Sequence, residues 1–266
     1  NGLDGVFVLR HPDDAHRLRM AIGGRRRAVV IGGGYIGLEV AASLTKIGVK
    51  VDVIEMADRL LARVASPPIS DFFAALHQSH DVQLHLGASS DEILQQDGSF
   101  TGVRLDSGGV LEADLLLVGI GVSPDLDLAA DAGIACGNGI LVNAMMQSSI
   151  DDIFAIGDVA LIDGGALRIE SVDNSQVTAA RAAAAICGTA QPAIAAPWFW
   201  SEQFDVRLQS AGIVPVAVPG VQYRVRPGKR EGGFSVWSYD GAGVLAAVEA
   251  VRDPAGYMLG KKCLDL

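Results

Sequence analysis

Three glycines are spaced so that the backbone around them could bind a phosphate group. Gly32, Gly34 and Gly37 follow an apolar run over residues 28–31, and a helical pattern begins at once. The first glycine permits a tight turn from strand to helix, the second lets the backbone approach a pyrophosphate, and the third lets the helix pack against its strand. The helix N-terminus then offers N–H groups and the positive end of its dipole. The residues assigned to this predicted dinucleotide site are Gly32, Gly34, Tyr35, Ile36 and Gly37.

A glutamate supplies the second half of the same motif. Gly48 is a plausible helix end, residues 49–54 have the composition of a buried strand, and Glu55 ends that strand 23 positions after Gly32. A carboxylate there accepts hydrogen bonds from ribose hydroxyls and repels a 2′-phosphate, which favours NAD over NADP. The alternative is an α/β domain with a glycine-rich turn and a surface glutamate.

Other residues near this motif have two interpretations each. Glu39 lies in the first turns of the helix. Its carboxylate either interacts favourably with the positive end of the helix dipole or points at a nicotinamide carboxamide or a nearby lysine. Arg59 and Arg63 follow Glu55, and each could meet adenine or a phosphate or simply be solvated. Gly121, at the end of a buried strand, suits a close approach of the backbone to a nicotinamide ribose.

Further along the chain, an aspartate and an aromatic cluster could face a ligand. Asp158 follows an apolar run, where it is either a turn cap or an acceptor for ligand hydroxyls at the carboxyl end of a parallel strand. The Trp-Phe-Trp run at 198–200 is either core or the face toward a flavin or a protein partner. The five histidines show no metal-binding spacing, and no Ser–His–Asp set can be assembled.

Composition excludes several function classes. The formal net charge of −10 gives no support to general nucleic-acid binding. The three cysteines are far apart, with no Cys-x-x-Cys, so neither a redox dithiol nor a zinc ribbon is indicated and a reducing cytoplasm is expected. No signal peptide and no run as long as a membrane span is visible.

The elements that must position these residues follow from hydrophobic periodicity. A short strand and a polar helix precede the glycine motif, and a helix from about Ser70 to His77 follows it. A turn at 106–109 between strand-like runs indicates a β-hairpin. Buried strands are expected at 82–86, 114–119 and 151–158. A later helix is expected at 175–187, with Gly188 as its end. Antiparallel strands near the C-terminus are expected at 214–218, 221–225, 234–239 and 244–251, followed by a short helix after Pro254.

The order of these segments resembles that of the FAD-dependent ferredoxin–NAD reductases of bacterial oxygenase systems, of the putidaredoxin reductase and biphenyl dioxygenase ferredoxin reductase type. The segments that carry the resemblance are 29–39, Glu55, 119–124, 151–158, 170–172 and 197–203. The resemblance implies an α/β protein with the pyridine nucleotide–disulfide oxidoreductase fold. By this resemblance the protein would comprise a Rossmann-like NAD domain, part of a second, FAD-binding Rossmann-like domain, and a C-terminal α+β interface domain.

The same resemblance implies a division of the chain. Residues 1–23 would end a first FAD-domain segment, 24–145 would form the NAD-binding domain, 146–192 a second FAD-domain segment, and 193–266 a truncated interface domain lacking its last helix. The N-terminal half of the FAD domain, with its own glycine motif, has no counterpart in the sequence.

Residue roles carry over position by position. Asp158 resembles an aspartate that binds the flavin ribityl or phosphate region, Glu170, Ser171 and Val172 resemble the stretch beside the isoalloxazine ring, and Trp200 resembles a tryptophan near the flavin on the acceptor side. Glu39 resembles the glutamate next to the nicotinamide. Two departures are Glu202, where the family usually has aspartate, and the segment 65–68 before the Ser70 helix.

The implied function is transfer of electrons from NADH through FAD to a [2Fe-2S] ferredoxin. Because such ferredoxins are usually acidic, a basic docking face is expected, with candidates Arg224, Arg226, Lys229 and Arg230. Two alternatives stay open: an NAD-binding fragment without flavin or reductase activity, and a relative of the rubredoxin reductase or apoptosis-inducing-factor type. The oligomeric state cannot be predicted.

Overall fold

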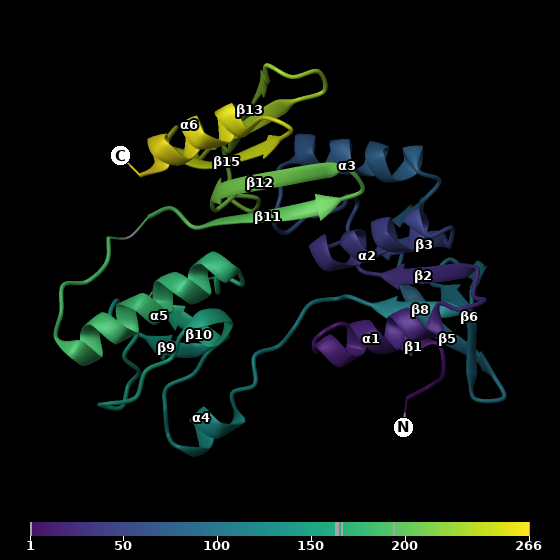
Figure 1. The fold of residues 1–266 in the computed structure, drawn as a ribbon, viewed down its shortest axis with the longest axis horizontal. Helices are drawn as coiled ribbons and strands as arrows, with labels where there is room; N and C mark the ends of the chain where they lie inside the picture. The colour runs from purple at the N-terminus through teal and green to yellow at the C-terminus, as the bar shows by residue number, and fades with distance from the viewer. Residues whose placement is uncertain (1, 163–164, 166, 194, 266) are drawn as a thin grey trace.

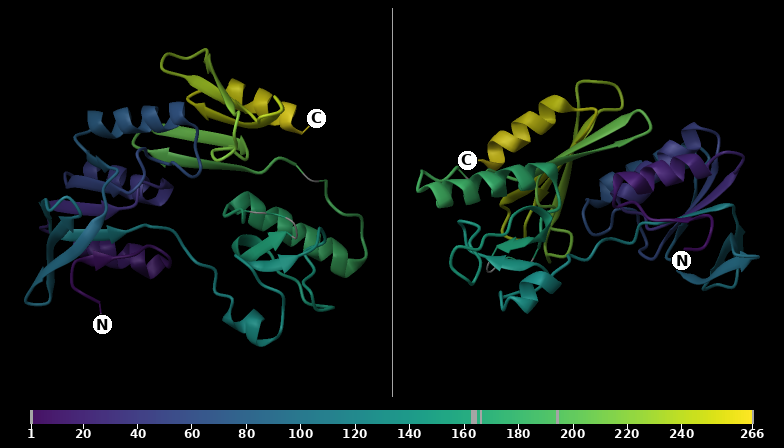
Figure 2. Two further views of the ribbon diagram at one scale, coloured as in Figure 1. Left: turned by 180° about the vertical axis from the view of Figure 1, so that it is seen from behind. Right: turned by 60° about the horizontal axis from the view of Figure 1, so that its bottom comes forward.

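The computed structural model describes residues 2–162, 165, 167–193 and 195–265, which form three units in chain order (Figure 1). We call residues 2–122 the N-terminal unit, the described residues within 125–193 the middle unit, and residues 197–265 the C-terminal unit. An extended segment leads from the first unit to the second. Both views in Figure 2 show the C-terminal unit lying against the N-terminal one.

A five-stranded parallel sheet forms the centre of the N-terminal unit. Its strand order is β1-β8-β2-β3-β4, and every pairing is parallel. The strands are β1 (Val6–Phe7), β2 (Arg27–Ile31), β3 (Lys50–Glu55), β4 (Gln83–Leu86) and β8 (Leu115–Val118). Their short apolar runs are typical of strands that are covered on both faces, and the Rossmann-like fold expected from the sequence is confirmed.

Three helices cover one face of this sheet and a β-meander covers the other. The helices are α1 (Pro12–Ala21), α2 (Tyr35–Lys46) and α3 (Pro67–Ser79). The meander consists of β5 (Ser90–Gln96), β6 (Ser99–Leu105) and β7 (Val110–Glu112), so the predicted hairpin at 106–109 is confirmed. Val30 belongs to the same core cluster as Leu38 and Phe73 of the helices, whereas Val29 on the opposite face packs in the cluster with Phe100.

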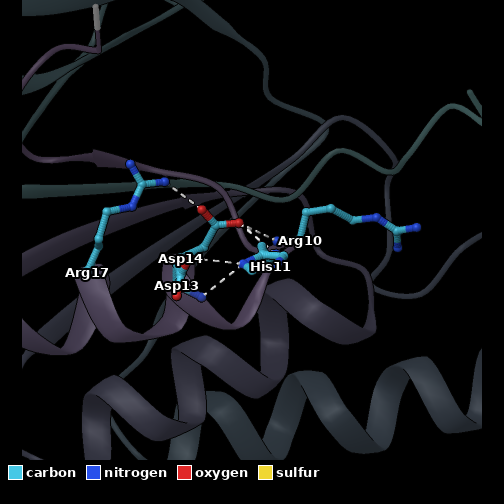
Figure 3. Close-up of polar contacts among 5 residues, drawn as sticks. All are labelled: Arg10, His11, Asp13, Asp14 and Arg17. Atoms are coloured by element: carbon cyan, nitrogen blue, oxygen red, sulfur yellow. Dashed lines mark hydrogen bonds and ion pairs between the residues drawn. The ribbon is translucent and has the colours of Figure 1, made fainter.

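The first segment of the chain belongs structurally to the N-terminal unit. Strand β1 is hydrogen-bonded to β8, and Leu18 of α1 lies in the helical core. At the start of α1, the Asp14 carboxylate accepts the N–H groups of Arg10 and His11 at 2.9 and 2.8 Å (Figure 3). These backbone donors, helped by Arg17, lower the pKa of Asp14 to about 2. Residue 23 therefore marks no break in this fold, whatever domain the resemblance gives to residues 1–23.

Helix α3 begins before Ser70, so the helix start predicted from the sequence is wrong. Ser66 is its N-cap residue and Pro67 its first helical residue. Proline is well suited to that position because it needs no N–H partner and its φ is already helical. The Ser70 hydroxyl instead donates to the Leu60 carbonyl at 2.5 Å from inside the helix. The segment 65–68, unusual in the sequence, is thus the helix start.

The middle unit is a small parallel pair of strands beside one long helix. Its elements are α4 (Asp127–Asp131), β9 (Ile140–Val142), the 3-10 helix η1 (Gly157–Val159), β10 (Ala160–Ile162) and α5 (Val172–Cys187). Gly188 ends α5 in the left-handed region at φ +64°, as predicted. The predicted strand at 151–158 is wrong: Asp152 and Gly157 have φ of +64° and +68°, which an extended strand cannot accommodate.

An antiparallel sheet and one helix make up the C-terminal unit. The strand order is β11-β12-β15-β14-β13, with α6 packed on one face. The bounds are β11 (Trp198–Gln203), β12 (Val206–Gly212), β13 (Gln222–Pro227), β14 (Phe234–Tyr239), β15 (Leu245–Val251) and α6 (Pro254–Leu264). The strand predicted at 214–218 is wrong, since these residues form turns next to Pro215. Strands β11 and β12 were not predicted.

Candidate functional site

The glycine turn has the geometry that its sequence predicts. Gly32 has a φ of +109°, and a Cβ on it would lie 2.4 Å from the carbonyl oxygen of Gly119. A Cβ on Gly37 would lie 2.1 Å from the carbonyl oxygen of Gly32, so α2 can approach β2 only because this position has no side chain. A Cβ on Gly34 would meet nothing within 4 Å. Gly34 therefore faces open space, where a ligand could approach the backbone.

The N-terminus of α2 remains available to an anion. Gly34 is its N-cap residue, and within the described residues no side chain caps it. The first N–H groups of a helix have no partner inside the helix, and the dipole adds partial positive charge at the same place. The turn and the helix start together can therefore accept a phosphate group.

Glu55 connects the turn to the end of β3. Its carboxylate accepts the Gly33 N–H at 2.7 Å and the Ala57 N–H at 2.8 Å. Two carboxylate oxygens offer about four acceptor positions, so Glu55 keeps capacity for ribose hydroxyls. Sequence reasoning missed this structural role, by which Glu55 also holds the conformation of the glycine turn.

Two arginines that the sequence could not distinguish have different surroundings. The guanidinium of Arg59 donates to the carbonyl oxygens of Ala62 and Ala65 at 2.8 and 2.9 Å and to the Ser70 hydroxyl at 2.6 Å. Its role is therefore to hold the loop before α3. Arg63 is exposed, and its Nη2 lies 3.6 Å from the position that a Cβ on Gly121 would take.

The carboxyl edge of the parallel sheet carries the glycine turn and two further predicted residues. Gly121, with φ +111°, follows β8, and Glu55 ends β3. Ligands of open α/β sheets bind at this edge, where the strand order reverses. The structure thus brings together the glycine turn, Glu55, Arg63 and Gly121, all within the N-terminal unit.

Glu39 has a partner that the sequence did not indicate. Its Oε1 accepts the Ser201 hydroxyl of β11 at 2.6 Å, across the boundary between the N-terminal and C-terminal units. Burial raises the pKa of this carboxyl group, against the opposing effect of the Ser201 hydroxyl. The alternation along β11 was the available signal, because Phe199, Ser201 and Gln203 share one face of the strand.

The residues assigned to a flavin lie mainly in the middle unit. Asp158 is in η1, and its carbonyl oxygen accepts a hydrogen bond from Arg168, whose guanidinium also pairs with Glu170 at 2.8 Å. Ser171 caps α5 by accepting the Asn174 N–H at 3.1 Å. Val172, the first residue of α5, is exposed. These four assigned residues therefore gather around the N-terminus of α5.

Trp200 lies in the C-terminal unit, at the exposed edge strand β11. Its ring stacks on Trp198 at 5.6 Å between centroids, and the Arg207 guanidinium lies 5.9 Å above it. Phe199 points the other way and packs on Tyr35 of α2 at 4.5 Å. The aromatic run is thus divided between an outer face and the contact with the N-terminal unit. Phe199 has the packing role that one interpretation predicts, and the assignment of Trp200 to a flavin or a partner stays a prediction.

Two features are absent from the described ranges. No helix there has the length and apolar character that crossing a membrane requires. In the same residues, no three or more His, Cys, Asp or Glu side chains are grouped as metal ligands would be.

Comparison with known proteins gives two family matches. Residues 1–184 match the profile of the family described as pyridine nucleotide-disulphide oxidoreductase, and residues 198–266 match the profile described as reductase C-terminal. Two curated relatives are a ferredoxin–NAD(P)(+) reductase from Sphingomonas sp., 39% identical over 99% of this chain, and rhodocoxin reductase from Rhodococcus erythropolis, 40% identical over 98%. The chain spans 64% and 61% of their lengths, less than two thirds.

Two solved structures resemble the fold closely. A ferredoxin reductase for the CYP199A2 system from Rhodopseudomonas palustris is 39% identical, with a TM-score of 0.91 over 98% of this chain and 64% of that one. The covalent putidaredoxin reductase–putidaredoxin complex also gives a TM-score of 0.91, at 34% identity over 99% of this chain and 64% of that one.

Proposed function

This chain belongs to the pyridine nucleotide-disulphide oxidoreductase family, and from that premise we propose that its N-terminal unit binds NADH. The observation that carries the proposal is the glycine turn at the carboxyl edge of the parallel sheet, with Glu55 bound to the Gly33 N–H. The pyrophosphate would lie at the start of α2 and the adenosine ribose at Glu55. Arg63 and Gly121 would border the rest of the dinucleotide. In the division of the chain implied by the resemblance, this is the NAD domain at 24–145.

The middle unit fits part of a flavin site. Arg168 Nε is buried with no hydrogen-bond partner in the part of the chain that the structure describes, beside Asp158 and Glu170. A buried donor without a partner is costly unless an acceptor reaches it, and a phosphate or hydroxyl oxygen of FAD would be such an acceptor. We assign Asp158, Glu170, Ser171 and Val172 to FAD contacts in the second FAD-domain segment, 146–192, and Trp200 of the interface domain, 193–266, to its acceptor side.

The proposed activity is that of a ferredoxin–NAD(+) reductase. When bound, FAD would accept two electrons from NADH and pass them on singly, which is chemistry that the cofactor supplies and the protein directs. The contribution of this chain is to hold the dinucleotide at the edge of the sheet, to select NADH through the Glu55 charge, and to place Trp200 on the outer face. The names of the relatives support this activity as a proposal for the whole protein.

The proposed partner is an acidic [2Fe-2S] ferredoxin that docks on the basic side chains of the C-terminal unit. Arg224 lies over the Tyr239 ring at 5.7 Å, and Arg226 lies over the Trp237 ring at 4.8 Å. These ring contacts hold both guanidinium groups on the face of the sheet that carries α6. Replacing both arginines by glutamate should slow electron transfer to the ferredoxin and reduce its dependence on salt; unchanged rates would refute the assignment.

NADH titration tests the nucleotide site. The unchanged chain should bind NADH at least about tenfold more tightly than NADPH, because Glu55 repels the 2′-phosphate. Glu55→Gln keeps an acceptor for the Gly33 N–H but removes the charge, so it should reduce this preference. Glu92→Gln, on the exposed meander, is the matched control and should leave the preference unchanged. Equal affinities for the two nucleotides in the unchanged chain would refute the assignment of Glu55.

Visible absorbance tests the flavin assignment separately. A bound flavin spectrum in the purified 266-residue chain would support the proposed FAD contacts. A colourless protein that still binds NADH would favour the alternative of an NAD-binding fragment without reductase activity.

A further inference from the structure

Three side chains connect Glu39 to the interior of the molecule. Ser201 Oγ donates to Glu39 Oε1 at 2.6 Å, and Gln203 Nε2 donates to Ser201 Oγ at 3.2 Å. Gln203 Oε1 in turn lies 2.8 Å from His77 Nε2 of α3. The chain of hydrogen bonds therefore runs from α3 through β11 to α2, and it crosses between the N-terminal and C-terminal units twice.

The positions of the available protons give these hydrogen bonds one direction. An ionised Glu39 has no proton of its own, so the single hydroxyl hydrogen of Ser201 must point at it. The Ser201 oxygen can then accept from the Gln203 amide nitrogen. The Gln203 carbonyl oxygen is left to accept, which requires the proton of His77 to be on Nε2. Each donor meets an acceptor only in this order as long as Glu39 is charged.

Burial makes the arrangement rigid. Ser201, Gln203 and His77 are 1%, 0% and 0% exposed, so none of them can exchange its partner for bulk water. Burial also lowers the pKa of His77, which keeps the ring neutral and its tautomer dependent on the hydrogen bond to Gln203. The buried hydrogen bonds among these side chains form one network, so removing one member affects the others. His77 Nδ1, at the far end, is buried with no partner among the described residues.

Glu39 is close to the proposed nucleotide site along its own helix. It is five residues beyond Gly34 in α2, which at about 1.5 Å per residue is about 7.5 Å along the helix axis. The Ser201 hydroxyl and the Glu202 N–H both favour the charged form of Glu39, and a carboxylate offers about four acceptor positions. The second oxygen or the second lone pair can therefore meet a donor on the ligand.

We propose that Ser201, Gln203 and His77 are positioning residues through which the C-terminal unit orients Glu39 at the dinucleotide site. The inference rests on the proposed function, since it takes the start of α2 as the site of NADH. It makes nucleotide recognition by the N-terminal unit dependent on a strand of the C-terminal unit, 162 residues away along the chain.

NADH affinity in single and double variants tests the proposal. Ser201→Ala should raise the Kd for NADH by about threefold to tenfold, as expected for the loss of one orienting hydrogen bond. Glu39→Gln should weaken binding at least as much, and the double variant should match Glu39→Gln alone. Ser238→Ala is the matched control, because this hydroxyl is buried in the same sheet with no partner among the described residues.

Ser201→Thr keeps a hydroxyl and should restore most of the affinity, which separates positioning from a fault in folding. Additive effects of Ser201→Ala and Glu39→Gln, or a Ser201→Ala variant that binds like Ser238→Ala, would overturn the chain of hydrogen bonds while leaving the nucleotide site intact. Absence of NADH binding by the unchanged chain would instead overturn the proposed function, and the inference with it.

Two further measurements would not respond to a merely structural role. The Ser201 hydroxyl holds down the pKa of Glu39, which is faced by Tyr35 and Glu202, with Glu249 beyond Tyr35. Ser201→Ala should therefore move the acid limb of NADH binding to higher pH, and an unmoved limb would count against the proposal. Imidazole ¹⁵N spectra should show His77, assigned with a His77→Asn variant, as the Nε2–H tautomer; the Nδ1–H tautomer would reverse the direction and overturn the proposal.

Discussion

A buried carboxylate of the C-terminal unit should make stability depend on pH. Glu249, in β15, is 0% exposed, and its two oxygens share the N–H of Ser66, the N-cap residue of α3, with the Ser66 nitrogen 3.2 Å from each oxygen. Burial raises the pKa of this group to about 7 from 4.5. Arg59 and Ser66 oppose the increase, and the other titratable groups facing it are the hydroxyls of Tyr35 and Tyr223.

The size and sign of the effect follow from the difference in proton binding. The folded protein holds a proton on Glu249 up to about pH 7, whereas the unfolded chain loses it near pH 4.5. The stability contribution of the protonated carboxyl is therefore complete below pH 4.5 and is lost as the pH rises to about 7. At about 1.4 kcal/mol per pKa unit, the loss is about 3 kcal/mol.

Urea unfolding of Glu249→Gln between pH 4 and about 8 measures this contribution. The amide oxygen can still accept the Ser66 N–H but does not ionise. The variant should therefore approach the unchanged protein at low pH and exceed its free energy of unfolding by up to about 3 kcal/mol at pH 8. Glu231→Gln, an exposed carboxylate of the same unit, should give a curve parallel to that of the unchanged protein. A parallel curve for Glu249→Gln as well would refute the reasoning.

Four other substitutions test the local geometry. Gly37→Ala should cost about 1–3 kcal/mol of stability in urea unfolding, because its Cβ would lie 2.1 Å from the Gly32 carbonyl oxygen. Gly34→Ala should keep the stability but weaken NADH binding in the same titration, and equal stability losses for the two would contradict their separate roles. Tyr35→Phe removes a buried hydroxyl that has no partner among the described residues, so its melting temperature should stay level or rise; a clear fall would reveal a hidden hydrogen bond. Ser171→Ala removes the N-cap of α5 and should lower the free energy of unfolding by about 1 kcal/mol. An unchanged free energy of unfolding would contradict this capping role.

The glycine turn was predictable because each of its requirements is local. Gly32 must adopt a positive φ, Gly37 must have no Cβ beside the Gly32 carbonyl, and a strand must end at Glu55. One βαβ unit contains all three, and each leaves a mark in residue type or spacing. The starts of helices and strands were less predictable where a turn interrupted an apolar run, as at Gly157, or where a proline began a helix, as at Pro67.

The partners of Glu39 and Glu249 depended on how the units pack. Glu39 meets Ser201 at a separation of 162 residues, and Glu249 meets Ser66 at 183. A carboxylate on a helix or strand has the same local sequence pattern whether it faces solvent, a ligand or a distant hydroxyl. Packing of Phe199 on Tyr35, together with the shared apolar core of the two units, brings β11 onto α2 and its polar residues toward Glu39. Residue type and spacing thus established the fold class and the glycine turn, whereas the surroundings of these buried carboxylates came from long-range apolar packing that no local pattern encodes.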